Sequence, residues 1–135
     1  MDNFLYQEET YNLRGCMINV HKELGCGFFE KVYQEALELE FKAHGIPYKR
    51  EQKLPIYYKG EPLHLDYIAD FICYDKIVIE LKAVTELTDI HFAQVLNYLK
   101  ATKMDLGLLV NFGENSLHVE RIFNYRKNQK NQKNP

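Results

Sequence analysis

The segment Ile77–Val84, which reads IVIELKAV, constrains the possible folds more than any other part of this chain. Its apolar residues are typical of a strand that is buried on both faces of a sheet. Because side chains alternate along a strand, Glu80 and Lys82 project from the same face, about 7 Å apart. In a core strand, an acid and a base side by side are costly unless neighbouring groups compensate the two charges.

The surrounding sequence predicts an α/β fold of α+β character with a mixed sheet. In chain order we expect helices over 8–24 and 29–44, strands over 48–58, 63–74 and 77–84, a helix over 89–102, and strands over 105–112 and 116–123. Short turns between the first three strands predict an antiparallel meander. Thr85 or Thr88 would cap the helix over 89–102, which leads to a strand parallel to one of its neighbours.

The length and composition fit one globular domain over residues 1–125. The chain has 135 residues, 46% hydrophobic and 27% charged, so it can bury a core and does not read as disordered. No apolar run approaches the roughly 20 residues that cross a bilayer, and the acidic start is no secretory signal, so we expect no membrane contact. Three cysteines without metal-ligand spacing favour reduced thiols and a cytoplasmic location.

Charge is distributed unevenly along the chain. The net charge of −2 does not suggest a protein that coats nucleic acid through charge alone. Residues 126–135 form a basic stretch, with four Lys or Arg residues and no acid. We expect a disordered tail there, and the alternative is an arm that attracts phosphate groups without sequence preference.

The turn before Ile77 predicts that a second acid, on the preceding strand, lies close to Glu80. If that turn is of odd length and centred on Asp75, then Asp70 stands opposite Glu80, with Cβ atoms about 5 Å apart. Strict alternation then places Ala69 and Phe71 together on the other face. A slip of one residue would instead move Asp70 to the opposite side of the sheet.

Two buried carboxylates so close repel each other, and burial disfavours the ionised form of each. A hard cation such as Mg²⁺ removes this difficulty, because it prefers oxygen ligands and carries the compensating charge. Lys82 would then lie beside the ion, where it could stabilise a phosphate or help to position and deprotonate a water. The spacing leaves open an alternative, in which Lys82 neutralises Asp70 and Glu80 in an ion-pair network.

Three further residues belong to the same pattern. Glu30 lies near the start of the second helix, where alone it would only complement the helix dipole. Gln94 and Tyr98 are four residues apart and share one face of the helix over 89–102. Taken alone, Gln94 would be a solvated residue and Tyr98 a packed aromatic.

Together these stretches resemble the GxxExxY family of small bacterial proteins. The resemblance rests on GFFEKVY, ADFICYDKIVIELKAV and AQVLNYLKAT, and it covers about residues 11–123. That family is placed in the PD-(D/E)XK nuclease superfamily, on the branch that resembles RecB-type and lambda-exonuclease-type nucleases. The resemblance implies a restriction-endonuclease-like core of helix, three antiparallel strands, helix and strand, with an extra N-terminal helix and a C-terminal strand.

The resemblance also implies a metal site. Asp70 and Glu80 match the superfamily's metal-binding acids, which take part in catalysis. Glu30 matches the helix glutamate that joins the metal site, directly or through water, and the backbone carbonyl of Leu81 would be a further ligand. The ion would be Mg²⁺ or Mn²⁺, with no other cofactor.

The remaining motif residues receive roles in the same way. Lys82 matches the catalytic lysine. Gln94 and Tyr98 match a Q-x-x-x-Y motif that orients the active site and contacts DNA, so Gln94 would be both catalytic and substrate-binding. Tyr33 would only pack. Ala69 stands where the superfamily's name has a proline, a position that the chemistry does not need.

Three functions are therefore weighed. The first is a metal-dependent nuclease that hydrolyses DNA phosphodiester bonds. The second is a nucleic-acid-binding or assembly module that keeps the nuclease fold without turnover. The third is an interaction protein that works through its aromatic surface, since the chain has ten tyrosines and eight phenylalanines. A homodimer is a possible assembly, with the helix over 8–24 as the candidate contact.

Overall fold

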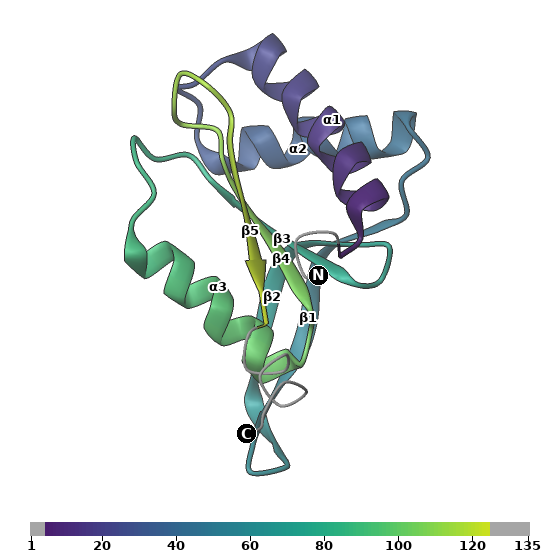
Figure 1. The fold of residues 1–135 in the computed structure, drawn as a ribbon, viewed down its shortest axis with the longest axis vertical. Helices are drawn as coiled ribbons and strands as arrows, with labels where there is room; N and C mark the ends of the chain where they lie inside the picture. Colours follow the sequence, from purple (N-terminus) through teal and green to yellow (C-terminus); the bar gives the residue numbers. More distant parts are fainter. Residues whose placement is uncertain (1–4, 125–135) are drawn as a thin grey trace.

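The computed structural model describes residues 5–124, which form helices and strands around one sheet (Figure 1). In chain order the elements are α1 (Gln7–Leu24), α2 (Glu30–Ala43), β1 (Tyr48–Tyr58), β2 (Glu61–Cys73), β3 (Ile77–Lys82), α3 (Asp89–Thr102), β4 (Leu106–Asn111) and β5 (His118–Phe123). The predicted mixed α/β fold is confirmed, and most element bounds agree within one or two residues. The basic stretch over 126–135 lies outside the described residues.

The sheet has the strand order β1-β2-β3-β4-β5. β1, β2 and β3 form the predicted antiparallel meander. After α3 the chain returns as β4, which pairs with β3 in parallel, and β5 pairs antiparallel with β4. β3 therefore lies in the middle of the sheet, with a hydrogen-bonded neighbour on each edge.

Helices cover both faces of the sheet (Figure 1). α1 and α2 pack on one face, over a core cluster that includes Tyr33 and Ile79. α3 packs on the other face, over a cluster that includes Val78 and Leu99. Consecutive residues of β3 are thus buried in different clusters, which explains why this strand reads as a continuous apolar run.

The ends of α3 are set by two residues in different ways. The helix begins after Thr88, one of the two predicted N-caps, whose backbone N–H donates to Nδ1 of His91 at 3.0 Å. It ends at Lys103, which has a φ of 65°. Glycine or asparagine is more usual in this left-handed position.

The alternation predicted for β2 is wrong at Asp70. Ala69 belongs to the cluster under α3, whereas Phe71 belongs to the cluster under α1 and α2. A regular strand would place these two residues on one face. The neighbouring residue on β1 is Glu51, whose φ of 51° is left-handed, and the pairing Arg50↔Phe71 continues beyond this point. The sheet therefore exchanges its faces at Asp70.

Candidate metal centre

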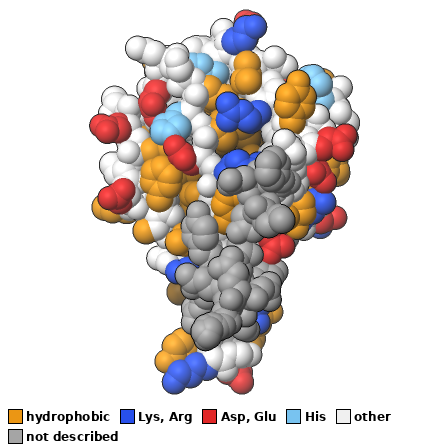
Figure 2. Space-filling view, in the orientation of Figure 1, with side chains coloured by type: hydrophobic (Ala, Val, Ile, Leu, Met, Phe, Trp, Pro, Cys, Tyr) orange, Lys and Arg blue, Asp and Glu red, His pale blue; other side chains and the backbone are white. Residues whose placement is uncertain are grey.

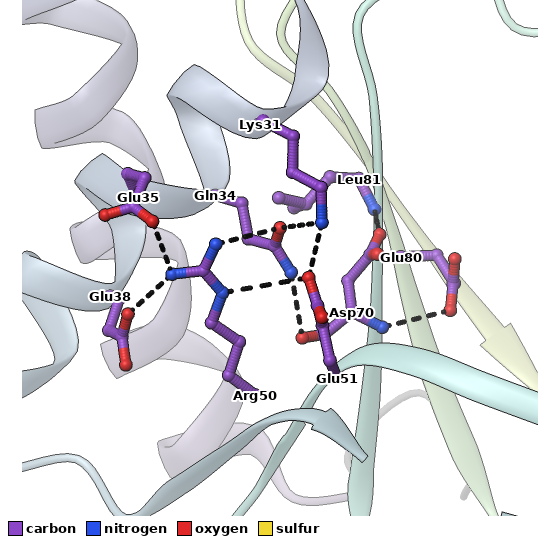
Figure 3. A network of polar contacts seen from close by, with 9 residues as sticks. All are labelled: Lys31, Gln34, Glu35, Glu38, Arg50, Glu51, Asp70, Glu80 and Leu81. Atoms are coloured by element: carbon purple, nitrogen blue, oxygen red, sulfur yellow. Dashed lines mark hydrogen bonds and ion pairs between the residues drawn. The ribbon is translucent and has the colours of Figure 1, made fainter. Parts of the chain in front are cut away.

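Asp70 and Glu80 lie side by side across β2 and β3. The pair Phe71↔Ile79 sets this register, as the odd-length turn predicted. The backbone N–H of Asp70 donates to Oε2 of Glu80 at 3.4 Å, and the backbone N–H of Leu81 donates to Oδ2 of Asp70 at 2.8 Å (Figure 3). Glu80 of β3 thus accepts a hydrogen bond from β2, and Asp70 of β2 accepts one from β3.

Burial raises the pKa of all three predicted acids. The pKa of Glu80 rises to about 8, through burial first and through the charge of Asp70 second. Burial is also the main cause that raises the pKa of Asp70 and of Glu30. The positive charge of Lys82 opposes the rise in each case, so its ammonium lies within electrostatic range of all three carboxyls.

Lys82 nevertheless forms no close ion pair within residues 5–124. No carboxylate oxygen of that part of the chain lies within 4.0 Å of its Nζ atom. The direct ion-pair network that the sequence left open is therefore not formed there. The half-buried ammonium of Lys82 acts on all three acids at longer range, and Lys31 also lowers the pKa of Asp70 and of Glu30, so the charges of the acids are compensated without a close ion pair to Lys82.

A groove of about 290 Å³ between the sheet and α3 reaches this cluster. It is lined by Asp66, Tyr67, Ile68, Glu80, Lys82, Gln94, Val95 and Tyr98. Four of the predicted site residues, from β3 and α3, therefore meet in one place. Asp70 joins them through its hydrogen bonds to β3, and Glu30 approaches from the first turn of α2.

Tyr67 is a site residue that the sequence analysis missed. Its hydroxyl donates to Oε2 of Glu80, and its ring stacks on Tyr98 with centroids 3.8 Å apart and planes 8° from parallel. Tyr67 therefore orients the Glu80 carboxylate and fixes Tyr98 of α3 against β2. A tyrosine in an alternating strand carries no motif, so only the sheet register and the position of α3 identify it.

Comparison with known families gives one result that decides the fold family. Residues 7–122 match the family described as the PD-(D/E)XK nuclease superfamily. This chain belongs to the PD-(D/E)XK nuclease superfamily. The order of helices and strands and the place of Asp70, Glu80 and Lys82 on β2 and β3 are consistent with that membership.

A solved structure has a similar fold. The protein named SSO0001 matches with a TM-score of 0.52 and 20% sequence identity, over 78% of this chain and 60% of that one. This chain therefore spans about three-fifths of that protein's length, and the likeness concerns the fold alone. A search of curated proteins gave no match. Among the described helices, none is long and apolar enough to cross a membrane.

PD-(D/E)XK nucleases typically use divalent metal ions, and the acids of this chain fit such an ion. Asp70 and Glu80 offer hard carboxylate oxygens, and burial, the main cause of their raised pKa values, disfavours their charged forms unless a cation compensates them. Within residues 5–124, the one group of three ligand atoms closer than 4.8 Å is Cys16, Glu40 and His44, between α1 and α2. The acids beside Lys82 are thus less crowded, and Mg²⁺ typically takes only one or two carboxylates from a protein.

A polar network from α2 and β1 contacts the backbone of Asp70 (Figure 3). Gln34, which is only 3% exposed, donates from Nε2 to the backbone carbonyl of Asp70 at 3.3 Å. Its Oε1 accepts from Lys31 at 3.2 Å and from Arg50 at 3.3 Å. Gln34 follows Glu30 by four residues, so both lie on one face of α2, and this spacing could have identified it.

The chain just after Lys82 is fixed by β4. Asn111 is fully buried; its Oδ1 accepts from the backbone N–H of Val84 at 3.0 Å, and its Nδ2 donates to the carbonyl of Val84 at 2.9 Å. Gly113 lies so close that a Cβ atom there would be 2.2 Å from the same carbonyl oxygen. These contacts set where β3 ends and therefore where Lys82 lies.

The G-x-x-E-x-x-Y stretch has a structural explanation. Gly27 has a φ of 115°, which a residue with a side chain rarely adopts, and α2 begins three residues later at Glu30. Tyr33 is fully buried; its hydroxyl donates to the carbonyl of Gly25 at 2.6 Å, and its ring stacks on Phe112. Tyr33 thus packs, and it fastens the turn that directs Glu30 toward the acids.

Proposed function

We propose that this protein is a nuclease that hydrolyses DNA phosphodiester bonds with Mg²⁺ or Mn²⁺ bound by Asp70 and Glu80. The observation that carries the proposal is that two half-buried carboxyls, Asp70 and Glu80, and the more exposed Glu30 all have raised pKa values near the Lys82 ammonium, which forms no close ion pair with any of them. If the cluster were only structural, it would gain stability from an ion pair between Lys82 and one of these carboxylates. We also assign the chain to the GxxExxY family on the RecB-like branch, on the motif residues Glu30, Gln94 and Tyr98.

The metal ligands in this proposal come from three elements. Asp70 and Glu80 would hold the ion, the carbonyl of Leu81 would contribute a further oxygen, and Glu30 would take part directly or through a water. When bound, the ion would supply a Lewis acid for the scissile phosphate. The hydrogen bond from the backbone N–H of Leu81 to Oδ2 fixes the orientation of the Asp70 carboxyl.

The other residues act on the substrate. Lys82, at the end of β3, binds a non-bridging phosphate oxygen and orients the attacking water. Gln94 and Tyr98 line the groove on its α3 side and contact the strand that is cut. Tyr67 keeps Glu80 and Tyr98 in place, so we regard it as a positioning residue.

A non-catalytic binding or assembly module is the second candidate. It is favoured by the two hydrogen bonds that Oε2 of Glu80 already accepts within the protein, from the Tyr67 hydroxyl and from the backbone N–H of Asp70. In that case nucleic acid would bind in the same groove without turnover. Metal-independent binding would then accompany an absence of cleavage.

The cellular setting is also part of the proposal. We place the protein in the cytoplasm because none of its three cysteines forms a disulfide. We further propose a homodimer through α1, which exposes Tyr11 and Ile18. Sedimentation of wild type and of Tyr11→Ser measures this: a dimer that the variant splits supports the contact, and a monomeric wild type excludes it.

Cleavage assays test the proposed activity. Single- and double-stranded DNA should be cut in Mn²⁺ by the wild-type protein, and Lys82→Ala and Asp70→Asn should each reduce the rate at least about 100-fold. Lys42→Ala, at an exposed position on α2, is the matched control and should keep full activity. Equal activity in wild type and in both site variants would contradict the proposal.

A further inference from the structure

The β1–β2 hairpin extends beyond the rest of the sheet. β3 pairs with β2 from Phe71 to Cys73, whereas the outer part of β2 pairs with β1 alone. This two-stranded ribbon projects past the end of α3, and basic, acidic and hydrophobic side chains gather at its tip (Figure 1 and Figure 2). Such ribbons are marginally stable by themselves, so a long exposed one calls for an explanation.

A second groove lies between this ribbon and the end of α3. It has a volume of about 720 Å³ and is lined by Tyr57, Lys59, Gly60, Asn97, Lys100, Ala101 and Lys103. Among the residues that the structure describes, this lining contains three lysines and no acidic residue. In a chain with a net charge of −2, three lysines thus gather beside the aromatic side chain of Tyr57.

One face of α3 joins this groove to the candidate metal centre. Gln94 and Tyr98 line the groove at the acids, and Asn97 and Ala101 line the groove at the hairpin. These four residues follow the spacing i, i+3, i+4, i+7, so they form one continuous stripe along the helix. A strand bound at Lys82 would reach the lysines by following this stripe.

The backbone at two of the lysines is unusual. Lys59 and Gly60 have φ values of 50° and 83°, the signs required by the two-residue hairpin turn in which Asn-Gly or Asp-Gly is preferred. Lys103, at the end of α3, has a φ of 65° where glycine or asparagine is usual. Both lysines thus occupy positions that glycine or asparagine would fill more easily, and both line this one groove.

We infer that this second groove binds the phosphate backbone of an unpaired nucleic-acid strand that continues from the cleavage site along α3 to the hairpin tip. The inference rests on the proposed function. Lysines along a groove with exposed aromatic residues are typical of single-strand binding, where bases stack on the rings. Tyr57, which lines the groove, is 46% exposed. Tyr58, next to it at the tip, is 62% exposed, and the Lys59 ammonium lies 5.4 Å from the centre of the Tyr58 ring.

Lysines could also be present for structural reasons. Lys100 and Lys103 complement the dipole at the end of α3, and lysine on a projecting hairpin discourages pairing with other chains. These roles predict that removing the lysines lowers stability or solubility and leaves nucleic-acid binding unchanged. The two explanations therefore differ in a measurable quantity.

Fluorescence anisotropy with a labelled 20-nucleotide poly-dT strand tests the inference. The full chain carries Asp70→Asn to prevent cleavage, and a chelator is present. The groove variant combines Lys59→Asn, Lys100→Gln and Lys103→Asn, and the matched control combines Lys22→Gln, Lys42→Gln and Lys49→Gln. Raising the salt from about 50 to about 200 mM weakens binding of both proteins. If three phosphate contacts are lost, this loss of affinity should be about 18-fold smaller in the groove variant than in the control.

Two single variants separate function from structure. Lys59→Asn should raise the melting temperature, because asparagine fits the left-handed turn, and should weaken binding at the same time. Tyr57→Ala should weaken binding of the single strand about tenfold, and Tyr57→Phe should restore it. Unchanged affinity and salt dependence in the groove variant would overturn the inference, as would equal weakening in the matched control.

The outcome also separates this inference from the proposed activity. Lysine-dependent binding without cleavage by the wild-type protein would support the second groove and contradict the nuclease. Cleavage that is unaffected by the groove variant, with unaffected binding, would support the nuclease and overturn the groove. Tighter binding of a duplex than of the single strand would also overturn it, because stacked bases are not available to the tyrosines.

Discussion

At the scale of single residues, the ionisation of Glu80 determines what the site can do. Its carboxyl is buried beside Asp70, and both causes favour the protonated form. In the folded protein without metal, Glu80 therefore retains its proton to about pH 8, while in the unfolded chain it loses the proton near its ordinary pKa of 4.5. A bound cation would replace that proton, so metal affinity should rise with pH.

Stability in the presence of a chelator should therefore depend on pH. The folded state binds more protons than the unfolded state between about pH 4.5 and pH 8, so the free energy of unfolding falls as pH rises through this window. In wild type this decrease in the free energy of unfolding should amount to up to a few kcal/mol, and Glu80→Gln should abolish it. Urea unfolding at pH 5 and pH 8 measures both.

The control for this experiment is Glu86→Gln, at an exposed position. His118 also has a raised pKa, because hydrogen bonds to Glu120 and Glu114 stabilise its charged form, and its contribution likewise falls as pH rises. The comparison between wild type and Glu80→Gln cancels that contribution. A pH slope that is the same in wild type and in Glu80→Gln would show that Glu80 is not protonated in the folded protein.

At the scale of elements, the position of Lys82 depends on the contact between the end of β3 and the end of β4. We expect Gly113→Ala to lower the free energy of unfolding by about 3 kcal/mol, since its Cβ would meet the Val84 carbonyl. Gly15→Ala, in an open position within α1, should instead raise it by about 0.5–1 kcal/mol. Urea unfolding of both variants measures these two changes. Equal changes in the free energy of unfolding would contradict this account of Gly113.

Most elements could be predicted from the sequence because their patterns are local. The apolar run at Ile77 and the turn near Asp75 each depend on neighbouring residues, and together they predicted the register that joins Asp70 to Glu80. The exchange of faces at Asp70 could not be predicted. It requires a left-handed Glu51, and a glutamate gives no sign of that conformation.

The candidate site was predictable in part. Glu80, Lys82, Gln94 and Tyr98 meet in one groove because alternation and helical spacing fix their faces. Tyr67 was missed because its contacts with Glu80 and Tyr98 depend on how α3 packs across the sheet. Tertiary packing of this kind has no local pattern.

At the scale of the whole molecule, the site lies where both faces of the sheet become accessible. Glu30 comes from α2 on one face, and Gln94 comes from α3 on the other. The exchange of faces at Asp70 allows an acid of β2 to lie between them. The site therefore requires both helical layers, which explains how widely the motif residues are separated along the chain.

The most direct test of the central claim is calorimetric titration of Mn²⁺ into the intact chain at pH 8. We expect one site in the wild-type protein, lost in Glu80→Gln and in Asp70→Asn, because both carboxylates bind the ion. Glu40→Gln, which alters the rival group between α1 and α2, should keep the site. Absence of binding in the wild type, or binding that survives both site substitutions and is lost in Glu40→Gln, would contradict the account.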